Sequence, residues 1–290
     1  MKPDYSGKKK RREAQPPERS IILKPGPAPA TEDAAVSEEM PEANGHSEVV
    51  GGLNAVLAAL NHRPRSCRTV MVAEGRHRNA ALDEIFNLIR RHGLGYRTVP
   101  RQALDRTYGR PGHQGVVALF DRRDYLSFED FLDTLPPEGP VMLLALDQVE
   151  DPGNLGALMR SALAFGAAGV IVPRERSAAL TPTAVNAAAG AAEVLPLIRV
   201  VNLRRSLEVL QKCGFWLAAA EEDGETDLFS FEFPERLVMV LGSEGRGVSP
   251  NIKKTCDYLL AIPQERNHVA SLNVSVAGAI FMCEFFRRFR

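Results

Sequence analysis

The sequence LVMVLGSEGRG, residues 237–247, decides the fold of this chain. Five apolar residues typical of a buried strand lead directly into a turn that contains three glycines. A second strand-like run, residues 258–262, is followed by Ser271-Leu272-Asn273, where an apolar helix begins. Two strands that bring a glycine-rich turn and a polar helix start close together are typical of an α/β site for a small ligand.

A third element of the same kind lies upstream. A strand over residues 141–146 leads into DQVEDPGN, residues 147–154, and then into a helix that carries Arg160. From residue 140 onward strands and helices alternate, which predicts a parallel sheet covered by helices on both faces. The predicted strands are 141–146, 169–172, 194–198, 215–220, 237–241 and 258–262, and the predicted helices are 155–165, 182–189, 202–212 and 271–289.

These motifs resemble the three signature motifs of the SpoU/TrmH family, the SPOUT-class RNA ribose 2'-O-methyltransferases. They read DQVEDPGNLGALMRSA (147–162), LGSEGRG (241–247) and IP followed by SLNVSVA (271–277). The resemblance continues in VVGGLNAVLAAL (49–60) and HQGVVA (113–118), so it covers residues 48–290. It implies an α/β catalytic domain with a deep trefoil knot, a homodimer, and S-adenosylmethionine as cofactor. Within the family, the chain most resembles the bacterial enzymes that methylate a guanosine of 23S rRNA.

The resemblance also assigns roles to individual residues. The implied catalytic residues are Asn154, Arg160, Glu244, Ser271 and Asn273. The implied cofactor-binding residues, which act mainly through backbone atoms, are Leu241, Gly242, Gly247, Ile262, Ser271 and Leu272. The local sequence by itself leaves plainer roles open. Asn154, Ser271 and Asn273 stand where helix-capping residues are common, and Glu244 is compatible with a solvent-exposed turn.

Arg160 lies in an otherwise apolar helical stretch, so we expect a buried guanidinium with a phosphate or a carboxylate nearby. Related enzymes are proposed to use this arginine to deprotonate the ribose hydroxyl. Because a guanidinium is a poor base, we expect it to orient the substrate and stabilise charge instead, with the proton lost to phosphate or water.

Composition divides the chain into four segments. Residues 1–46 are rich in Pro, Ala, Glu and Lys and predict a disordered tail, whose basic run Lys8–Arg12 suits either a loose RNA-binding arm or a solubilising segment. Residues 47–121 predict a small α/β domain, which the resemblance identifies as an L30-like RNA-binding domain. This domain carries eleven arginines against six carboxylates, as RNA contacts require. Residues 122–139 predict a linker, and residues 140–290 the methyltransferase domain. The elements predicted in the small domain are helices 53–60 and 80–91 and strands 69–73, 96–99 and 115–120.

Other features bound the class of protein. No apolar run is long enough for a membrane span and no secretory signal is visible, so we expect a cytoplasmic protein. Four scattered cysteines predict reduced thiols and no metal site. The final helix is apolar around most of its circumference, which predicts that a second subunit covers one side; burial inside one large core is the alternative.

One segment departs from the family pattern. Residues Gln264–Ala270 are one residue longer than usual and lack a glycine, which puts the shape of the cofactor loop in doubt. His268 there and His113 are predicted to be structural. The sequence thus predicts a 2'-O-methyltransferase that acts on a guanosine of 23S rRNA. The alternatives are a tRNA ribose 2'-O-methyltransferase and a catalytically silent RNA-binding factor of ribosome assembly.

Overall fold

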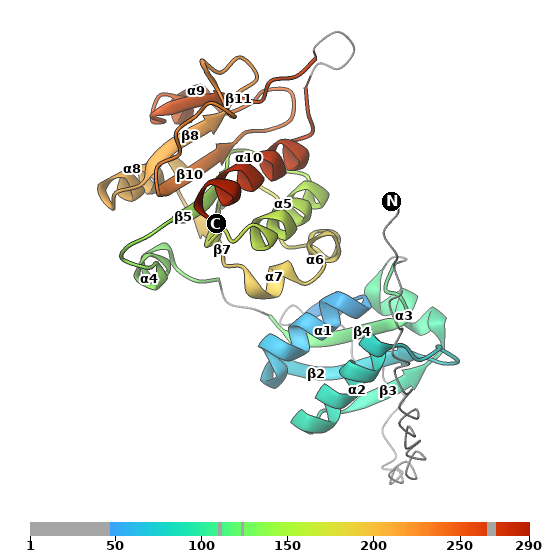
Figure 1. The fold of residues 1–290 in the computed structure, drawn as a ribbon. Coiled ribbons are helices and arrows are strands. Elements are labelled where there is room, and N and C mark those ends of the chain that lie inside the picture. The colour runs from blue at the N-terminus through green and yellow to red at the C-terminus, as the bar shows by residue number, and fades with distance from the viewer. Residues whose placement is uncertain (1–46, 110–111, 123–124, 266–270) are drawn as a thin grey trace, which may run out of the picture. The chain divides into compact units, whose positions relative to one another are not determined.

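The computed structural model describes residues 47–109, 112–122, 125–265 and 271–290. The predicted tail of residues 1–46 and His268 lie outside the described residues. Two β-sheets account for the strands of the described part, and each sheet carries its own helices (Figure 1).

The first sheet has four strands in the order β1-β4-β2-β3. Strands β1 and β2 pair antiparallel with β4, whereas β2 and β3 are parallel. Helix α2 begins at Ala80 because the Asn79 side chain accepts a hydrogen bond from the Leu82 N–H at 2.9 Å, and it ends at Gly93 in the left-handed conformation. The elements are β1 (Ser47–Gly51), α1 (Leu53–His62), η1 (Pro64–Ser66), β2 (Cys67–Ala73), α2 (Ala80–His92), β3 (Tyr96–Val99), α3 (Arg101–Tyr108) and β4 (Val116–Asp121).

The second sheet has seven parallel strands in the order β7-β6-β5-β10-β8-β11-β9, which confirms the predicted parallel sheet. The elements are α4 (Phe128–Thr134), β5 (Val141–Leu146), α5 (Pro152–Ala164), β6 (Gly169–Pro173), α6 (Pro182–Ala188), α7 (Ala191–Val194), β7 (Leu197–Val200), α8 (Leu203–Lys212), β8 (Trp216–Ala220), β9 (Thr226–Asp227), β10 (Arg236–Leu241), α9 (Pro250–Lys253), β11 (Tyr258–Ala261) and α10 (Val274–Phe289). The knot implied by the resemblance stays a prediction.

Helices cover both faces of this sheet. Alternate residues of β5 enter two separate cores, Leu144 with helices α5, α6, α7 and α10, and Leu143 with helices α4, α8 and α9. Helix α4 lies within the segment predicted to be a linker. Its Phe131 is fully buried against β5, β6 and β7, so part of that segment belongs to the hydrophobic core of the second sheet.

Helix α10 approaches α5 and β10 very closely at Gly278. A methyl group added there would lie 2.5 Å from Leu158 Cδ2 and 2.7 Å from Leu241 Cδ1. The close contact fixes the start of α10 beside the strand that precedes the glycine-rich turn. The sequence predicted that this helix begins at Ser271. It begins at Val274 instead, because Asn273 and not Ser271 caps it.

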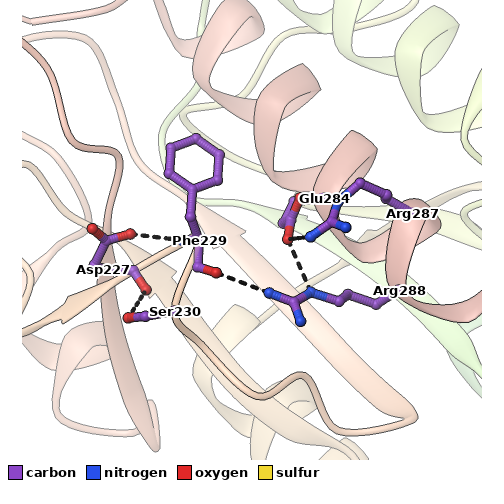
Figure 2. Close-up of polar contacts among 6 residues, drawn as sticks. All are labelled: Asp227, Phe229, Ser230, Glu284, Arg287 and Arg288. Carbon is purple, nitrogen blue, oxygen red and sulfur yellow. Dashed lines mark hydrogen bonds and ion pairs between the residues drawn. The ribbon is translucent and has the colours of Figure 1, made fainter.

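The end of α10 is held by ionic and polar contacts, which Figure 2 shows. Glu284 is buried and its Oε1 accepts hydrogen bonds from Arg287 Nη2 at 2.6 Å and Arg288 Nε at 3.0 Å. Arg288 also donates to the backbone carbonyl of Phe229 at 2.8 Å, in the turn that follows β9. That turn is closed by the Asp227 side chain, which accepts from the Phe229 N–H at 2.7 Å. These contacts connect the last turn of α10 to the edge of the sheet.

Three further features concern the described residues alone. None of their helices is long and apolar enough to cross a membrane. No group of three or more His, Cys, Asp or Glu side chains is placed there to hold a metal ion. All four cysteines are free thiols.

Candidate active site

Three neighbouring parallel strands, β5, β10 and β8, end at the same edge of the second sheet. Asp147 follows β5, Glu221 follows β8, and the turn of residues 242–249 follows β10. In parallel sheets, ligands bind beyond the carboxyl ends of the strands. The functional residues predicted from the sequence gather at this edge, with one exception.

A network of three side chains forms the centre of the site. Asn154 Nδ2 donates to Glu244 Oε1 at 3.0 Å, and Asn273 Nδ2 donates both to Asn154 Oδ1 at 3.0 Å and to Glu244 Oε1. The three residues come from α5, from the glycine-rich turn and from the start of α10. Glu244 is exposed, but it is the common acceptor of two amides rather than a plain surface carboxylate.

Capping decides which atoms are left for the site. Asp151, not Asn154, is the N-cap of α5, and its Oδ1 accepts from the Asn154 N–H at 2.7 Å. The Asn154 side chain is therefore available for Glu244. Asn273 caps α10 through Oδ1, which accepts from the Ser275 N–H at 2.9 Å and from Ser275 Oγ at 2.6 Å. Its amide nitrogen points the other way, into the network.

The glycine-rich turn folds back on the end of β10. Ser243 and Gly247 exchange two backbone hydrogen bonds of 3.2 and 3.0 Å. A methyl group on Gly242 would lie 1.9 Å from the carbonyl carbon of Gly247, so only glycine fits there. Gly245 and Gly247 have φ values of 80° and 64°, which glycine adopts without strain. The turn is thereby held close to the strand with its backbone exposed to a ligand.

A cavity of about 380 Å³ opens between this turn and α10, within the usual size of small-molecule sites. All six residues predicted to bind the cofactor line it: Leu241, Gly242, Gly247, Ile262, Ser271 and Leu272. Its charged lining residues are Glu221, Glu222, Asp223, Glu244, Arg246 and Lys253. The carboxylates outnumber the cations, which suits a ligand that carries positive charge.

A second, polar cavity of about 340 Å³ lies next to the first. Asn154, Asp151, Gln148 and Glu150 contribute to its wall. The two cavities share Ser243, Glu244, Arg246 and Val274. Because the Glu244 carboxylate is common to both, a group bound in one cavity lies close to a group bound in the other. This arrangement suits transfer between two ligands.

Arg160 is the predicted site residue that the structure does not bring into the network. The expectation of a buried guanidinium was wrong: Arg160 is exposed, and among the described residues it has no hydrogen bond or ion pair. Helix α5 buries Leu155, Leu158 and Met159 toward the core, and Arg160 follows on the opposite, open side. Its apolar neighbours in the sequence did not make the position of Arg160 apolar, because successive residues of a helix point about 100° apart.

Sequence reasoning gave no role to two carboxylates of this edge, Asp147 and Glu221. Each stands directly after a buried parallel strand, which is the signal that identifies them. His113, by contrast, lies between α3 and β4, in the domain of the first sheet. It is buried, accepts from the Gly115 N–H through Nδ1 at 3.0 Å and contacts Asp105 Oδ1 through Nε2 at 2.9 Å, as a structural histidine does.

Two family models match the chain. The SpoU rRNA Methylase family model matches residues 141–283. The model for RNA 2'-O ribose methyltransferase substrate binding matches residues 49–126. The two matches correspond to the second and the first sheet, respectively.

Similar proteins and solved structures belong to the same family as the two models. An enzyme of Staphylococcus aureus (strain COL) assigned to the TrmH family of tRNA/rRNA methyltransferases is 40% identical over 220 residues, which cover 76% of this chain and 88% of the relative. The 23S rRNA (guanosine-2'-O-)-methyltransferase RlmB of Pseudomonas syringae pv. tomato is 38% identical over 243 residues, 83% of this chain and 96% of the relative. The SpoU methyltransferase AviRb of Streptomyces viridochromogenes, solved in complex with AdoMet, superposes with a TM-score of 0.69 at 25% identity, over 84% of this chain and 90% of that one.

Proposed function

This chain belongs to the SpoU/TrmH family of RNA ribose 2'-O-methyltransferases, and we propose that it methylates the ribose 2'-hydroxyl of a guanosine in 23S rRNA with S-adenosylmethionine as the methyl donor. The 23S rRNA guanosine methyltransferase of Pseudomonas syringae supports the choice of substrate, because the similarity spans nearly its whole length. The observation that carries the proposal is the pair of adjoining cavities with the Asn154–Glu244–Asn273 network in their common wall.

The first cavity fits the cofactor. Its size, its excess of carboxylates and the exposed backbone of the glycine-rich turn suit a nucleoside that carries a sulfonium and an ammonium group. We assign Leu241, Gly242, Gly247, Ile262, Ser271 and Leu272 to this role. When bound, S-adenosylmethionine supplies a methyl group activated for transfer to an oxygen.

The second cavity suits the substrate ribose. Asn273 uses its amide within the network, whereas Asn154 donates one of its two N–H groups to Glu244 and keeps the other. Among the described contacts, Oε2 of Glu244 accepts no hydrogen bond. A ribose hydroxyl in this cavity can therefore accept from Asn154 and donate to Glu244 Oε2. Both bonds would aim the hydroxyl oxygen toward the first cavity. We assign its proton to Glu244, in place of the phosphate or water expected from the sequence, as the methyl group passes from the cofactor to that oxygen.

Arg160 and Arg246 supply positive charge for the RNA backbone. Arg246 lines both cavities and Arg160 is open to solvent on α5. A guanidinium binds phosphate through a planar fork of donors. We assign Arg160 to a phosphate of the bound RNA, since it is exposed and lines neither cavity.

The first sheet's domain suits RNA binding. Tyr96 and Arg97 are exposed on β3, the edge strand. In the sequence, exposed Arg91 precedes this strand and exposed Arg101 follows it. An aromatic ring among arginines provides stacking for bases and hydrogen bonds for phosphates. We propose that this edge contacts the rRNA.

We further propose a homodimer that forms through α5 and α10. An apolar groove of about 490 Å³ runs between the two helices, and Ala157, Val276, Ala279, Ile280 and Cys283 line it. Val276 is 48% exposed in the single chain. A second copy would cover the side of α10 that its own sheet leaves open, as the composition of the helix predicts.

Methyl transfer to rRNA tests this function directly. Purified protein, radiolabelled S-adenosylmethionine and 23S rRNA from cells that lack the protein should give methyl incorporation at one guanosine, located by 2'-O-methyl mapping. Total tRNA from the same cells is the parallel substrate. Incorporation into tRNA alone would support the tRNA branch instead, and binding of rRNA with no transfer would support a silent assembly factor.

A further inference from the structure

Two carboxylates hold the glycine-rich turn from both of its neighbouring strands. Strand β10, which leads into the turn, lies between β5 and β8 in the sheet. Asp147, directly after β5, accepts a hydrogen bond from the Ser249 N–H through Oδ2 at 2.7 Å. Glu221, directly after β8, accepts from the Val248 N–H through Oε1 at 3.2 Å. Two consecutive backbone N–H groups are thus bound by carboxylates from opposite sides.

These contacts bind the end of the turn, Val248 and Ser249, which lies outside its internal backbone hydrogen bonds. The first part is closed by the two backbone bonds between Ser243 and Gly247. After Gly247 the chain enters the short helix α9, whose N-cap Ser249 makes no side-chain capping bond. Asp147 and Glu221 supply acceptors to this end of the turn from outside it. Without them, Val248 and Ser249 would lose those acceptors in a largely buried place.

The burial of both carboxylates shows that they are not surface groups. Asp147 is 6% exposed, and among the described residues it has no cationic partner. The Glu221 side chain is 14% exposed and pairs with Lys253 Nζ at 2.6 Å. Burying a carboxylate costs free energy unless hydrogen bonds compensate. Here the compensating donors include the backbone of the turn.

The negative charges also act on the thiol of Cys256. Burial first, and then the negative charges of Asp257, Glu221 and Asp147, raise the pKa of Cys256 to about 12. Asp147 and Glu221 are themselves largely buried, and in such surroundings a hydrogen bond to a charged acceptor is strong.

We infer that Asp147 and Glu221 are positioning residues for the cofactor, which hold Gly247, Val248 and Ser249 so that the turn keeps its place in the wall of the first cavity. Gly247 lines that cavity, and Glu221 reaches it as well. This inference rests on the proposed function, because it takes the ligand of the cavity to be S-adenosylmethionine. Glu244, at the other end of the turn, is held separately by Asn154 and Asn273.

The inference predicts a loss of cofactor affinity with little loss of turnover. In Asp147→Ala and Glu221→Ala the calorimetric Kd for S-adenosylmethionine should rise about 10- to 100-fold, as expected for one hydrogen bond to a charged group. Turnover at saturating cofactor should fall less than about threefold, because Glu244 keeps its own partners. Asp147→Asn should bind within about fivefold of the wild type, since an amide oxygen accepts the same N–H.

A rescue separates the bond to the turn from the ion pair. In Glu221→Gln, the side-chain oxygen can accept from the Val248 N–H only if the side-chain amide group faces Lys253. Both of those groups are hydrogen-bond donors, so they repel each other. The double variant Glu221→Gln with Lys253→Met removes the conflict and should bind the cofactor more tightly than Glu221→Gln alone. A role limited to charge predicts instead that Asp147→Asn binds as weakly as Asp147→Ala, because both variants lose the carboxylate charge.

Asp257→Ala is the matched control. Asp257 also accepts a backbone N–H, from Leu217 at 2.8 Å, but at the amino end of β8. Its loss should lower the thermal midpoint without changing the Kd. If the alanine variants at 147 and 221 show the same Kd as this control, the inference is wrong. If they do not fold, Asp147→Asn and the Glu221→Gln pair decide: an Asp147→Asn variant that binds more than about fivefold more weakly than the wild type, or a double variant that binds no more tightly than Glu221→Gln, makes the inference wrong. A wild type that binds no S-adenosylmethionine overturns the proposed function itself, and the inference with it.

Discussion

Asn273 donates a hydrogen bond to the side chain of Asn154 at 3.0 Å, although 119 residues separate the two in the sequence. One amide caps the last helix and the other lies in the first turn of α5. The cap of α10 and the reactive wall of the site are therefore the same group of atoms. Any change that moves the start of α10 also moves the acceptor and donor offered to a ribose.

Asn273→Ala should remove both the cap of α10 and the hydrogen bonds of Asn273 to Asn154 and Glu244. We expect methyl transfer to fall by about 10²- to 10⁴-fold, because Glu244 and Asn154 each lose a partner that orients them. Stability should fall by about 1 kcal/mol from the lost cap. Single-turnover transfer of a radiolabelled methyl group measures the first effect and thermal unfolding the second.

Asn202→Ala separates the two effects. Asn202 caps α8 in the same way, and its Oδ1 accepts from the Arg205 N–H at 3.0 Å. This variant should lose similar stability and keep its activity. Equal activity losses in both variants would show that the Asn273 effect is only structural.

Arg160→Ala should cut methyl transfer by about 10²- to 10⁴-fold. Because Arg160 is exposed and unpaired among the described residues, stability and cofactor affinity should hardly change. Arg160→Lys should restore little, since an ammonium lacks the planar fork. Arg204→Ala, which removes an exposed arginine paired with Glu208 on α8, is the control and should stay active. An Arg160→Ala enzyme with near wild-type turnover would remove this residue from the mechanism.

The homodimer should protect one thiol. Cys213 and Cys283 are exposed in the single chain, whereas burial raises the pKa of Cys67 to about 11 and that of Cys256 to about 12. Buried thiols that stay protonated at neutral pH react slowly. In a dimer through α10, a maleimide should therefore modify Cys213 and spare Cys283. Light scattering should give about twice the 31.8 kDa of one chain.

Ile280→Asp should release the protected thiol, because it places a charge in the groove between α5 and α10. Val201→Asp is the control, since Val201 is 78% exposed and does not line that groove. A wild-type chain that scatters as a monomer at micromolar concentration, with Cys283 freely reactive, would contradict the proposed dimer.

Glu284 should make stability depend on acid. Its hydrogen bond to Arg287, and then that to Arg288, hold the pKa of Glu284 below its ordinary 4.5. A carboxyl whose pKa is lower in the folded state stabilises that state above the unfolded pKa, and the contribution is lost as the pH falls through the folded value. Glu284→Gln should therefore be less stable than wild type near neutral pH, with a gap that narrows below about pH 4. Urea unfolding of both proteins across this pH range measures the difference in their free energies of unfolding. A difference that does not change with pH would refute the prediction.

RNA affinity should depend on the edge of the first sheet. Tyr96→Ala and Arg97→Ala should each weaken rRNA binding, and the arginine variant should also flatten its salt dependence, because one phosphate contact is lost. Deleting residues 1–46 should leave activity largely intact, whereas deleting residues 1–121, which keeps α4 and its buried Phe131, should keep cofactor binding and lose rRNA affinity. Full rRNA affinity in that shorter chain would place recognition elsewhere.

The sequence by itself determined the elements and the chemistry that they carry. Apolar strands such as 141–146 and 237–241 are short, continuous and bounded by turn residues, and they fold where the local pattern predicts. The three motifs predicted Asn154, Glu244 and Asn273 as site residues, and their side chains contact one another in the structure. Short elements such as α3, α9 and β9 were missed, because a few residues carry too little periodicity to be recognised.

Only the tertiary structure decided how those residues meet. Sequence alone could not tell whether Asn154 caps α5 or reaches Glu244, since either role suits an asparagine at a helix start; Asp151 takes the cap and frees the amide. It could not show that Asp147 and Glu221 bracket the same turn, because strand order places β10 between strands that are not its neighbours in the chain. The sequence also predicted a buried Arg160 guanidinium with a phosphate or carboxylate partner, whereas the packing of α5 on one side only leaves that side chain in solvent. Contacts between distant segments depend on packing that no local pattern encodes.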